Sequence, residues 1–222
     1  MARAHLSRSL VEADALIEVA RRRAAVLAVG HTERFNPAVR AALPMLSSPR
    51  FIEVHRLGTF PDRSLDIDVV FDLMIHDLDL VLSAVRSPVT AIDAVGVPVL
   101  TPRIDIANVR LRFESGCIAN LTASRISRER TRKIRFFQTG SYVSVDCAEQ
   151  EVEVWRLVRP PAGMPTIEGG IVPVERAEPL ALELEDFVAA VASGTAPGVT
   201  GEDGRRAVAL AQQITDAMSA IH

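Results

Sequence analysis

Cysteine is scarce in this sequence: Cys117 and Cys147 are the two among its 222 residues. Two cysteines are too few for a disulfide framework, which indicates a reducing compartment such as the cytoplasm. The first ten residues contain no apolar core of signal-peptide length. The longest apolar stretch, residues 69–85, is interrupted by three aspartates and a histidine, so we expect no membrane span.

An excess of charge of either sign is also missing. The 25 basic and 28 acidic residues give a formal net charge of −3, so we expect neither nucleic acid nor an anionic membrane as the main partner. The hydrophobic content of 48% and the charged content of 24% are typical of a folded globular protein. The length allows one large domain or two small ones.

A glycine-rich phosphate loop is absent. The pattern G-x-G-x-x-G does not occur, and Gly198, Gly201 and Gly204 have a different spacing. Such a loop, at the amino end of a helix, is what cradles the diphosphate of a dinucleotide. We therefore expect this chain alone to bind neither NADH nor NADPH to a useful degree.

The amino-terminal part has the pattern of the end of another domain. Ser9 and Glu12 have the spacing of a capping box and predict a helix over residues 10–22. The apolar residues 24–30 predict a short, fully buried strand. A helix that leads into a buried strand is how a doubly wound domain ends. We therefore expect residues 1–36 to be the remnant of a dinucleotide-binding Rossmann domain, with the chain beginning in the middle of a fold.

Residues 37–222 predict a second domain of the α/β (α+β) class. Alternation with a period of two over residues 107–113, a turn at 114–116 and a similar stretch at 117–126 predict a β-hairpin. Successive hairpins imply an open-faced, mostly antiparallel sheet with helices on one face. Further strands are predicted at 51–60, 133–138, 142–147 and 151–157, helices at 38–46, 69–85, 182–192 and after Thr200, and a loop at 160–173.

A polar stripe on the apolar helix over 69–85 is the sharpest chemical feature. Asp72, His76, Asp79 and Ser83 fall within about 60° of one another at helical spacing. Asp72 can orient the imidazole of His76, and a positioned histidine can take a hydroxyl proton while a hydride leaves the same carbon. His76 and Asp72 are therefore candidate catalytic residues, and Asp79 is a candidate for substrate binding.

Two other interpretations of the same stripe remain open. His76 can be a core histidine whose polar atoms are satisfied by Asp72. Asp72 and His76 can also share a metal ion, with His31 or His55 completing the site. We assign no metal.

The segment that follows the expected buried strand is a second candidate. It reads Gly30-His-Thr-Glu-Arg-Phe-Asn-Pro37, and ligands of open α/β sheets collect at the carboxyl ends of strands. Arg34 and Asn36 are therefore candidate substrate-binding residues, and Gly30 and His31 are candidate cofactor-binding residues. The segment can equally be a connection in which Asn36 caps the helix that begins at Pro37.

A basic run is the third candidate. Its members are Arg125, Arg128, Arg130, Arg132, Lys133 and Arg135. Guanidinium groups suit phosphate and carboxylate oxygens, so Arg125 and Arg128 are candidate substrate-binding residues. The alternative is that the run consists of solvated strand and turn residues.

With these motifs in this order, the chain resembles the glucose–fructose oxidoreductase/inositol dehydrogenase (Gfo/Idh/MocA) family over residues 6–222. The matches are Gly30-His31 through Arg34-Phe-Asn-Pro37, Asp72-x-x-x-His76-Asp77, the 114–116 turn with Ser124-Arg125, and Gly201-Glu-Asp-Gly204-Arg. The resemblance implies an NAD- or NADP-dependent oxidoreductase acting on CH–OH, with a Rossmann domain followed by a domain that holds a sugar substrate and builds a homo-oligomer. Asp72 and His76 would contact and deprotonate a substrate hydroxyl.

The sequence departs from the family pattern near its amino end. The family has a lysine in a Glu-Lys-Pro triplet before the first helix, and Ala4 stands at that position here. We therefore expect this chain alone to be inactive. A non-catalytic binding or assembly subunit is the alternative function, and a metal-dependent lyase or isomerase is a third.

Two features concern the partners of the parent enzyme. The segments 30–37 and 66–79 resemble most the members of the family that act on UDP-N-acetylglucosamine, and the basic run can neutralise a diphosphate. We therefore expect a nucleotide-sugar substrate. We also expect self-association through the polar face of the hairpin, which carries Asn108, Arg110, Arg112, Asn120, Thr122 and Ser124.

Overall fold

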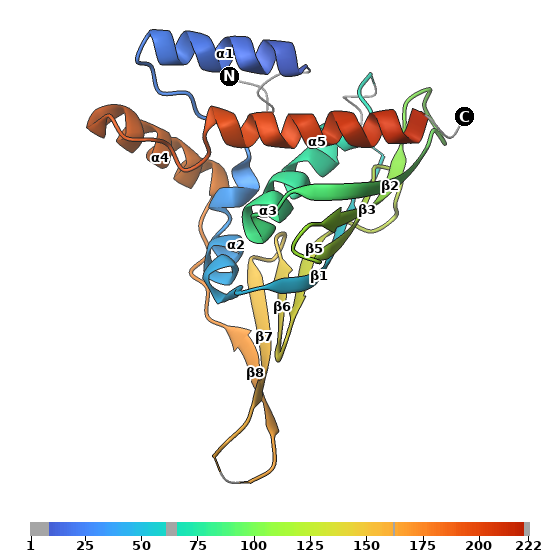
Figure 1. Ribbon diagram of the computed structural model, residues 1–222, viewed down its shortest axis with the longest axis vertical. Helices are drawn as coiled ribbons and strands as arrows, with labels where there is room; N and C mark the ends of the chain where they lie inside the picture. The colour runs from blue at the N-terminus through green and yellow to red at the C-terminus, as the bar shows by residue number, and fades with distance from the viewer. Residues whose placement is uncertain (1–8, 61–65, 162, 220–222) are drawn as a thin grey trace.

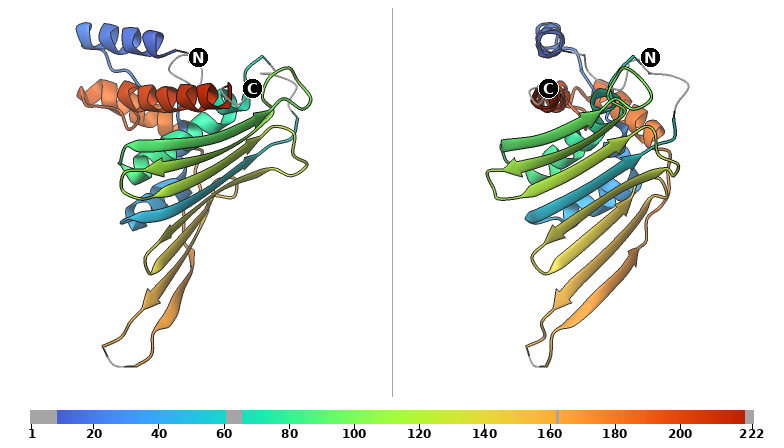
Figure 2. Two further views of the ribbon diagram at one scale, coloured as in Figure 1. Left: turned by 45° about the vertical axis from the view of Figure 1, so that its right-hand side comes forward. Right: turned by 90° about the vertical axis from the view of Figure 1, so that its right-hand side faces the viewer.

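The computed structural model describes residues 9–60, 66–161 and 163–219, and within that part a single eight-stranded sheet carries helices on one face (Figures 1 and 2). The strand order is β2-β3-β4-β1-β5-β6-β7-β8. The strands are β1 Pro49–Leu57, β2 Val89–Val97, β3 Ile106–Phe113, β4 Ile118–Ser124, β5 Thr131–Gln138, β6 Ser141–Asp146, β7 Glu151–Val158 and β8 Thr166–Val172. The helices are α1 Leu10–Arg22, α2 Pro37–Ala42, α3 Ile75–Val85, α4 Pro179–Ser193 and α5 Gly201–Ser219, with 3-10 turns η1 Thr32–Phe35 and η2 Leu43–Met45 and a π turn η3 Val70–Met74.

The sheet consists of two antiparallel meanders joined by β1. Strands β2 to β4 form one meander, and β5 to β8 form the other. Between them, β1 pairs parallel with β4 and antiparallel with β5. The predicted α/β class and the mostly antiparallel, open-faced sheet are confirmed.

The core lies between the sheet and the helices α3 and α5. On β3 the residues Ala107, Val109, Leu111 and Phe113 are buried, as the period of two requires. They belong to one cluster with Leu78 and its apolar neighbours on α3 and with the apolar side of α5. In Figure 1, α5 runs across the upper part of the molecule, below α1 and above α3 and β2. None of the helices in the described ranges is long and apolar enough to cross a membrane.

Local capping signals gave accurate helix ends. The Ser9 hydroxyl accepts a hydrogen bond from the Glu12 backbone N–H at 3.3 Å, and α1 begins at Leu10. Gly194 ends α4 with a φ of 68°, a left-handed conformation that glycine adopts without steric cost. Thr200 and Asp203 form a reciprocal cap at the start of α5.

The predicted buried strand over residues 24–30 is wrong. This segment forms one isolated antiparallel bridge, Ala28 to Thr200. Of its residues only Val29 is buried, while Ala24 and Ala25 are exposed. A strand needs a continuous row of backbone partners on a neighbouring strand, and in the part of the chain that the structure describes this segment has one such contact.

Two strands go beyond the predicted set. The predicted loop over residues 160–173 contains β8, whose Gly169 and Gly170 have φ values of 154° and 144°. The adjacent glycines gave this strand the composition of a loop. At the other edge, β2 pairs with β3. The predicted helix over 38–46 is α2 followed by the η2 turn that contains Pro44.

Candidate functional site

The helix that carries the polar stripe begins with a π turn. The Asp68 carboxylate accepts hydrogen bonds from the backbone N–H groups of Val70 and Phe71, at 3.0 and 3.1 Å, which fixes the start of the turn. The π turn over Val70–Met74 then leads into α3. Such turns insert one residue relative to an α-helix and occur often at functional sites. Here the turn contains Asp72, and His76 follows in the first turn of α3.

Asp72 and His76 line one pocket of about 430 Å³. The same wall carries Glu33 and Asn36 from the segment around η1, Arg56 from β1 and Arg132 from β5, together with Gln150 and Glu178. Three carboxylates and two guanidinium groups thus face a space shared with two amides and an imidazole. Such groups are suited to binding several hydroxyls of a small polar ligand.

His31 lies against His76 rather than in the open. The two Nδ1 atoms are 3.5 Å apart, and the ring planes meet at 86°. His31 is only 1% exposed. In an N–H···N hydrogen bond between these atoms only one of them carries the proton, so the tautomers of the two rings depend on each other. His31, which the sequence suggested for a cofactor, is in contact with the candidate catalytic histidine.

An ion-pair network supports the floor of this pocket, and the sequence pattern missed it. Arg56 donates two hydrogen bonds to Asp77, from Nε at 2.7 Å and from Nη2 at 2.8 Å. Its Nη1 lies 3.1 Å from Glu33 Oε1. Although burial disfavours the charged form, Asp77 and Glu33 keep the pKa of Arg56 above its usual value. The sequence signal for a buried Arg56 is the alternation along β1, since Arg56 follows the buried Ile52 and Val54 at a spacing of two.

Asn36 caps α2 and also lines the pocket that contains His76. Its Oδ1 accepts a hydrogen bond from the Ala38 backbone N–H at 3.0 Å and caps α2. Its Nδ2 donates to the backbone oxygen of Cys147 at 2.9 Å, which fixes the amide on the pocket wall. Burial, and then the Glu33 carboxylate, raise the pKa of the Cys147 thiol well above its usual value. Cys147 is therefore held as a neutral thiol and not as a nucleophilic thiolate.

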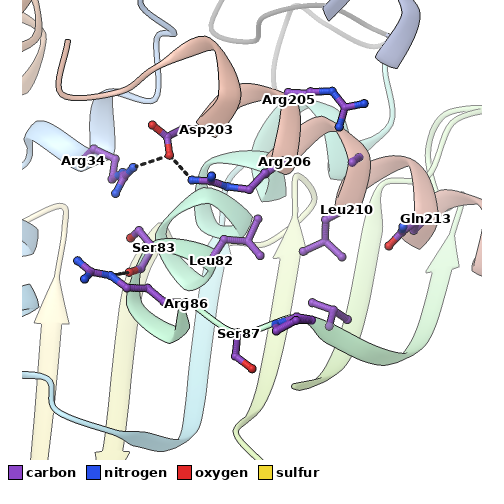
Figure 3. Close-up of a pocket in the computed structure, with 13 residues that line it drawn as sticks. Arg34, Leu82, Ser83, Arg86, Ser87, Asp203, Arg205, Arg206, Leu210 and Gln213 are labelled. Atoms are coloured by element: carbon purple, nitrogen blue, oxygen red, sulfur yellow. Dashed lines mark hydrogen bonds and ion pairs between the residues drawn. The ribbon is translucent and has the colours of Figure 1, made fainter. Parts of the chain in front are cut away.

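The far end of the polar stripe belongs to a different pocket (Figure 3). Arg34 and Ser83 line this second pocket, whose volume is about 740 Å³. Arg34 Nε lies 3.0 Å from Asp79 Oδ2, and Asp79 is 3% exposed. Burial raises the pKa of Asp79 to about 6, although Arg34 acts in the opposite direction. The stripe is therefore divided, with Asp72 and His76 on one pocket and Ser83 on the other.

Arg125 does not lie where a substrate can reach it. It is 1% exposed, and its Nη2 donates to the backbone oxygens of Ile67 and Ile104. Its Nε lies 3.5 Å from Asp105 Oδ1. These contacts argue against the expected substrate-binding role. The guanidinium group of Arg125 instead binds the connections at one end of the sheet. Arg128 is exposed on the β4–β5 connection, and of the basic run Arg132 lines the His76 pocket.

The described residues contain no cluster of three or more His, Cys, Asp or Glu side chains that could hold a metal ion. His55, which we considered as a ligand beside His76, lies on β1 with Nε2 3.9 Å from Glu53 Oε1. The metal interpretation of the stripe therefore gains no support from these positions.

Comparison with known proteins identifies the class. The family model described as GFO/IDH/MocA C-terminal domain matches residues 48–144. A UDP-N-acetylglucosamine 3-dehydrogenase from Acidithiobacillus ferrooxidans is 39% identical over 211 residues, which cover 94% of this chain and 67% of that protein. The chain belongs to the Gfo/Idh/MocA family of oxidoreductases.

Solved structures agree with this assignment. A structure of the Acidithiobacillus ferrooxidans enzyme superimposes with a TM-score of 0.89 at 38% identity, covering 96% of this chain and 69% of that chain. An oxidoreductase domain protein from Kribbella flavida gives a TM-score of 0.84 at 16% identity, with 98% of this chain and 71% of that chain covered. At that identity the second likeness concerns the fold alone.

Proposed function

We propose that this chain is the substrate-binding part of an oxidoreductase that acts on a secondary ring hydroxyl of a nucleotide-activated sugar. The observation that carries the proposal is the placement of Asp72 and His76 on one pocket wall, with His31 against His76. The name of the 39% identical relative, a UDP-N-acetylglucosamine 3-dehydrogenase, supports a nucleotide sugar as the substrate class.

In this proposal His76 accepts the hydroxyl proton. The Nδ1 atom of His76 faces that of His31 at 3.5 Å, and we assign the proton between them to His76, so that His31 accepts. Nε2 of His76 then holds the lone pair that takes the substrate proton. Asp72 binds the reacting hydroxyl or orients the ring. The carboxylates of Asp72, Glu33 and Glu178 on the same wall favour the imidazolium that results.

Gly30 and His31 do not fit the diphosphate of a dinucleotide. The His31 ring is buried against His76, and both residues lead into the four-residue η1 turn instead of a glycine-rich loop before a long helix. A nicotinamide cofactor accepts the hydride in this class of enzyme when it is bound. The proposal therefore assigns to this chain the binding of the substrate and the movement of the proton.

We further propose that residues 1–36 complete a dinucleotide-binding domain and that residues 37–222 form the substrate domain. On α1 the side chains of Val11, Leu16 and Val19 are exposed, and such an apolar face on a helix supports packing against further structure.

We also propose self-association through the open sheet face. There Asn108 Nδ2 donates to Thr122 Oγ1 at 2.8 Å and Arg110 Nη1 to Asn120 Oδ1 at 3.1 Å, which gives a pre-ordered polar surface. Sedimentation velocity should find a discrete oligomer, and a well-folded monomer at tens of micromolar would contradict this part.

A direct test follows the ring nitrogens of His76. Long-range ¹H–¹⁵N spectra of the chain should show neutral His76 protonated at Nδ1, with this tautomer lost in His31→Leu, which removes the acceptor. In an enzyme restored by joining the chain to the dinucleotide-binding part of its relative, His76→Ala should lower kcat by about two to four orders of magnitude, with His55→Ala as the control. Normal turnover in His76→Ala would refute the catalytic assignment, and binding of UDP-N-acetylglucosamine by the joined enzyme without any turnover would favour a binding subunit.

A further inference from the structure

The larger of the two pockets described above is lined by arginines from three segments (Figure 3). Arg34 comes from η1, Arg86 from the carboxyl end of α3, and Arg205 and Arg206 from the first turns of α5. Leu82, Pro88, Val89 and Leu210 give the same pocket an apolar side. Its volume of about 740 Å³ is in the range of pockets that hold ligands the size of a nucleotide.

The arginines exceed the carboxylates that neutralise them. Arg205 pairs with Asp14, Arg206 with Asp203, and Arg34 with both Asp79 and Asp203. Four guanidinium groups against these three carboxylates leave a charge of +1 (4 − 3 = 1). Within the described ranges Arg86 has no carboxylate at ion-pair distance, and its Nε donates to the Ser83 backbone oxygen at 3.3 Å.

The arginines of this pocket already make contacts within the chain before any ligand arrives. Arg34 has a side chain that is 17% exposed, and its Nη2 lies 3.5 Å from Asp203. Figure 3 shows Arg34 and Arg206 directed at Asp203 from opposite sides, with Arg86 folded back on Ser83. Arg86 follows the last turn of α3 with a φ of 49°, and the carbonyl groups at that helix end favour a cation. An arginine held as Arg34 is, between Asp79 and Asp203, loses little conformational entropy on binding an anion.

We propose that this pocket is a binding site for a nucleoside diphosphate. Phosphate oxygens would contact Arg86, Arg206 and Arg34, and the base would lie on the apolar side formed by Leu82, Pro88, Val89 and Leu210. The site is distinct from the His76 pocket, because Ser83 follows His76 by seven residues, or about 10 Å along α3. The inference does not rest on the proposed oxidoreductase function. A free nucleotide and the nucleotide part of a larger ligand share this chemistry.

The test uses calorimetric titration of the 222-residue chain with UDP, uridine and inorganic pyrophosphate. UDP should bind more tightly than either of the others, because it alone offers both a base and phosphates, and its affinity should fall as salt is raised. Titration with UDP-N-acetylglucosamine separates the two sources: affinity equal to that of UDP identifies a nucleotide site, and a gain that His76→Ala abolishes identifies a substrate that reaches both pockets.

Two variants remove charge at the site, and two others serve as controls. Arg86→Asn keeps a residue that tolerates a positive φ, and Arg206→Gln keeps a polar side chain. Each should weaken UDP binding about tenfold or more, since a charge-assisted contact to phosphate is lost. Arg40→Gln, an exposed charge on α2, and Arg132→Gln, on the His76 pocket, should leave UDP affinity unchanged. Absence of UDP binding at millimolar concentration, or loss of binding in Arg132→Gln but not in Arg86→Asn, would overturn the proposal.

Discussion

Replacing Asp79 by asparagine removes a carboxylate whose pKa differs strongly between the folded and unfolded chain. Burial raises its pKa from 3.8 to about 6, against the opposing effect of Arg34. Between these two pH values the folded chain retains a proton that the unfolded chain has released. The stability linked to this proton is therefore fully present below pH 3.8 and is lost as the pH rises through 6.

The size of the effect follows from the two pKa values. A difference of about two pKa units corresponds to about 3 kcal/mol in total, of which roughly 2.5 kcal/mol is lost between pH 4 and pH 7. The free energy of unfolding of the natural chain, minus that of Asp79→Asn, should fall by this amount over that range. Carboxylates that do not interact with Asp79 cancel in the subtraction.

Urea unfolding followed by circular dichroism at several pH values measures this difference. Asp93→Asn, which removes an exposed carboxylate from β2, controls for the loss of one negative charge. A difference that stays flat or rises from pH 4 to pH 7 would show that Arg34 outweighs burial, and the reasoning would then be refuted.

Two further pairs of variants test the buried network and the projecting hairpin. Asp77→Asn should lower the free energy of unfolding by about 3–5 kcal/mol, because the buried Arg56 loses its charged partner. Lys133→Gln, which breaks a half-exposed pair with Asp146, should lower it by at most about 1 kcal/mol. Equal losses in the two variants would contradict the reasoning from burial. Gly169→Ala should destabilise the β7–β8 hairpin far more than Gly170→Ala, because a Cβ at position 169 would lie 1.9 Å from the Val154 backbone oxygen while nothing lies within 4 Å at position 170. Similar melting temperatures for the two alanine variants would disprove the close approach.

Helix ends and buried strand faces were predictable because their causes are local. The Ser9 and Thr200 caps, the left-handed Gly194 and the alternation along β3 depend on residues close in sequence. The strand β8 was missed because its cause is not local. Gly169 and Gly170 are typical of a loop, and the segment becomes a strand only through its pairing with β7.

The candidate site was predictable only in part, because side-chain partners depend on the tertiary fold. The spacing of Asp72 and His76 indicated a shared surface, but a π turn that interrupts the helix has no clear local pattern. The ion pair between Arg56 and Asp77 joins residues 21 apart, and the contact of His31 with His76 joins residues 45 apart. Arg125 was misjudged because its burial depends on connections that meet it from elsewhere in the chain.

The position of β1 has a consequence for the order of folding. Both meanders can form from neighbours in sequence, but β1 pairs with β4 and β5, whose partner residues lie more than sixty positions further along the chain. Closing such long loops costs entropy before any contact is gained, so the insertion of β1 between two finished hairpin sets should be the slow step. Until then, the facing edges of β4 and β5 are open to strands of other molecules. Refolding yield should therefore fall with protein concentration. During synthesis from the amino end, β1 is the first of the eight strands to be made, so it remains unpaired for the longest time.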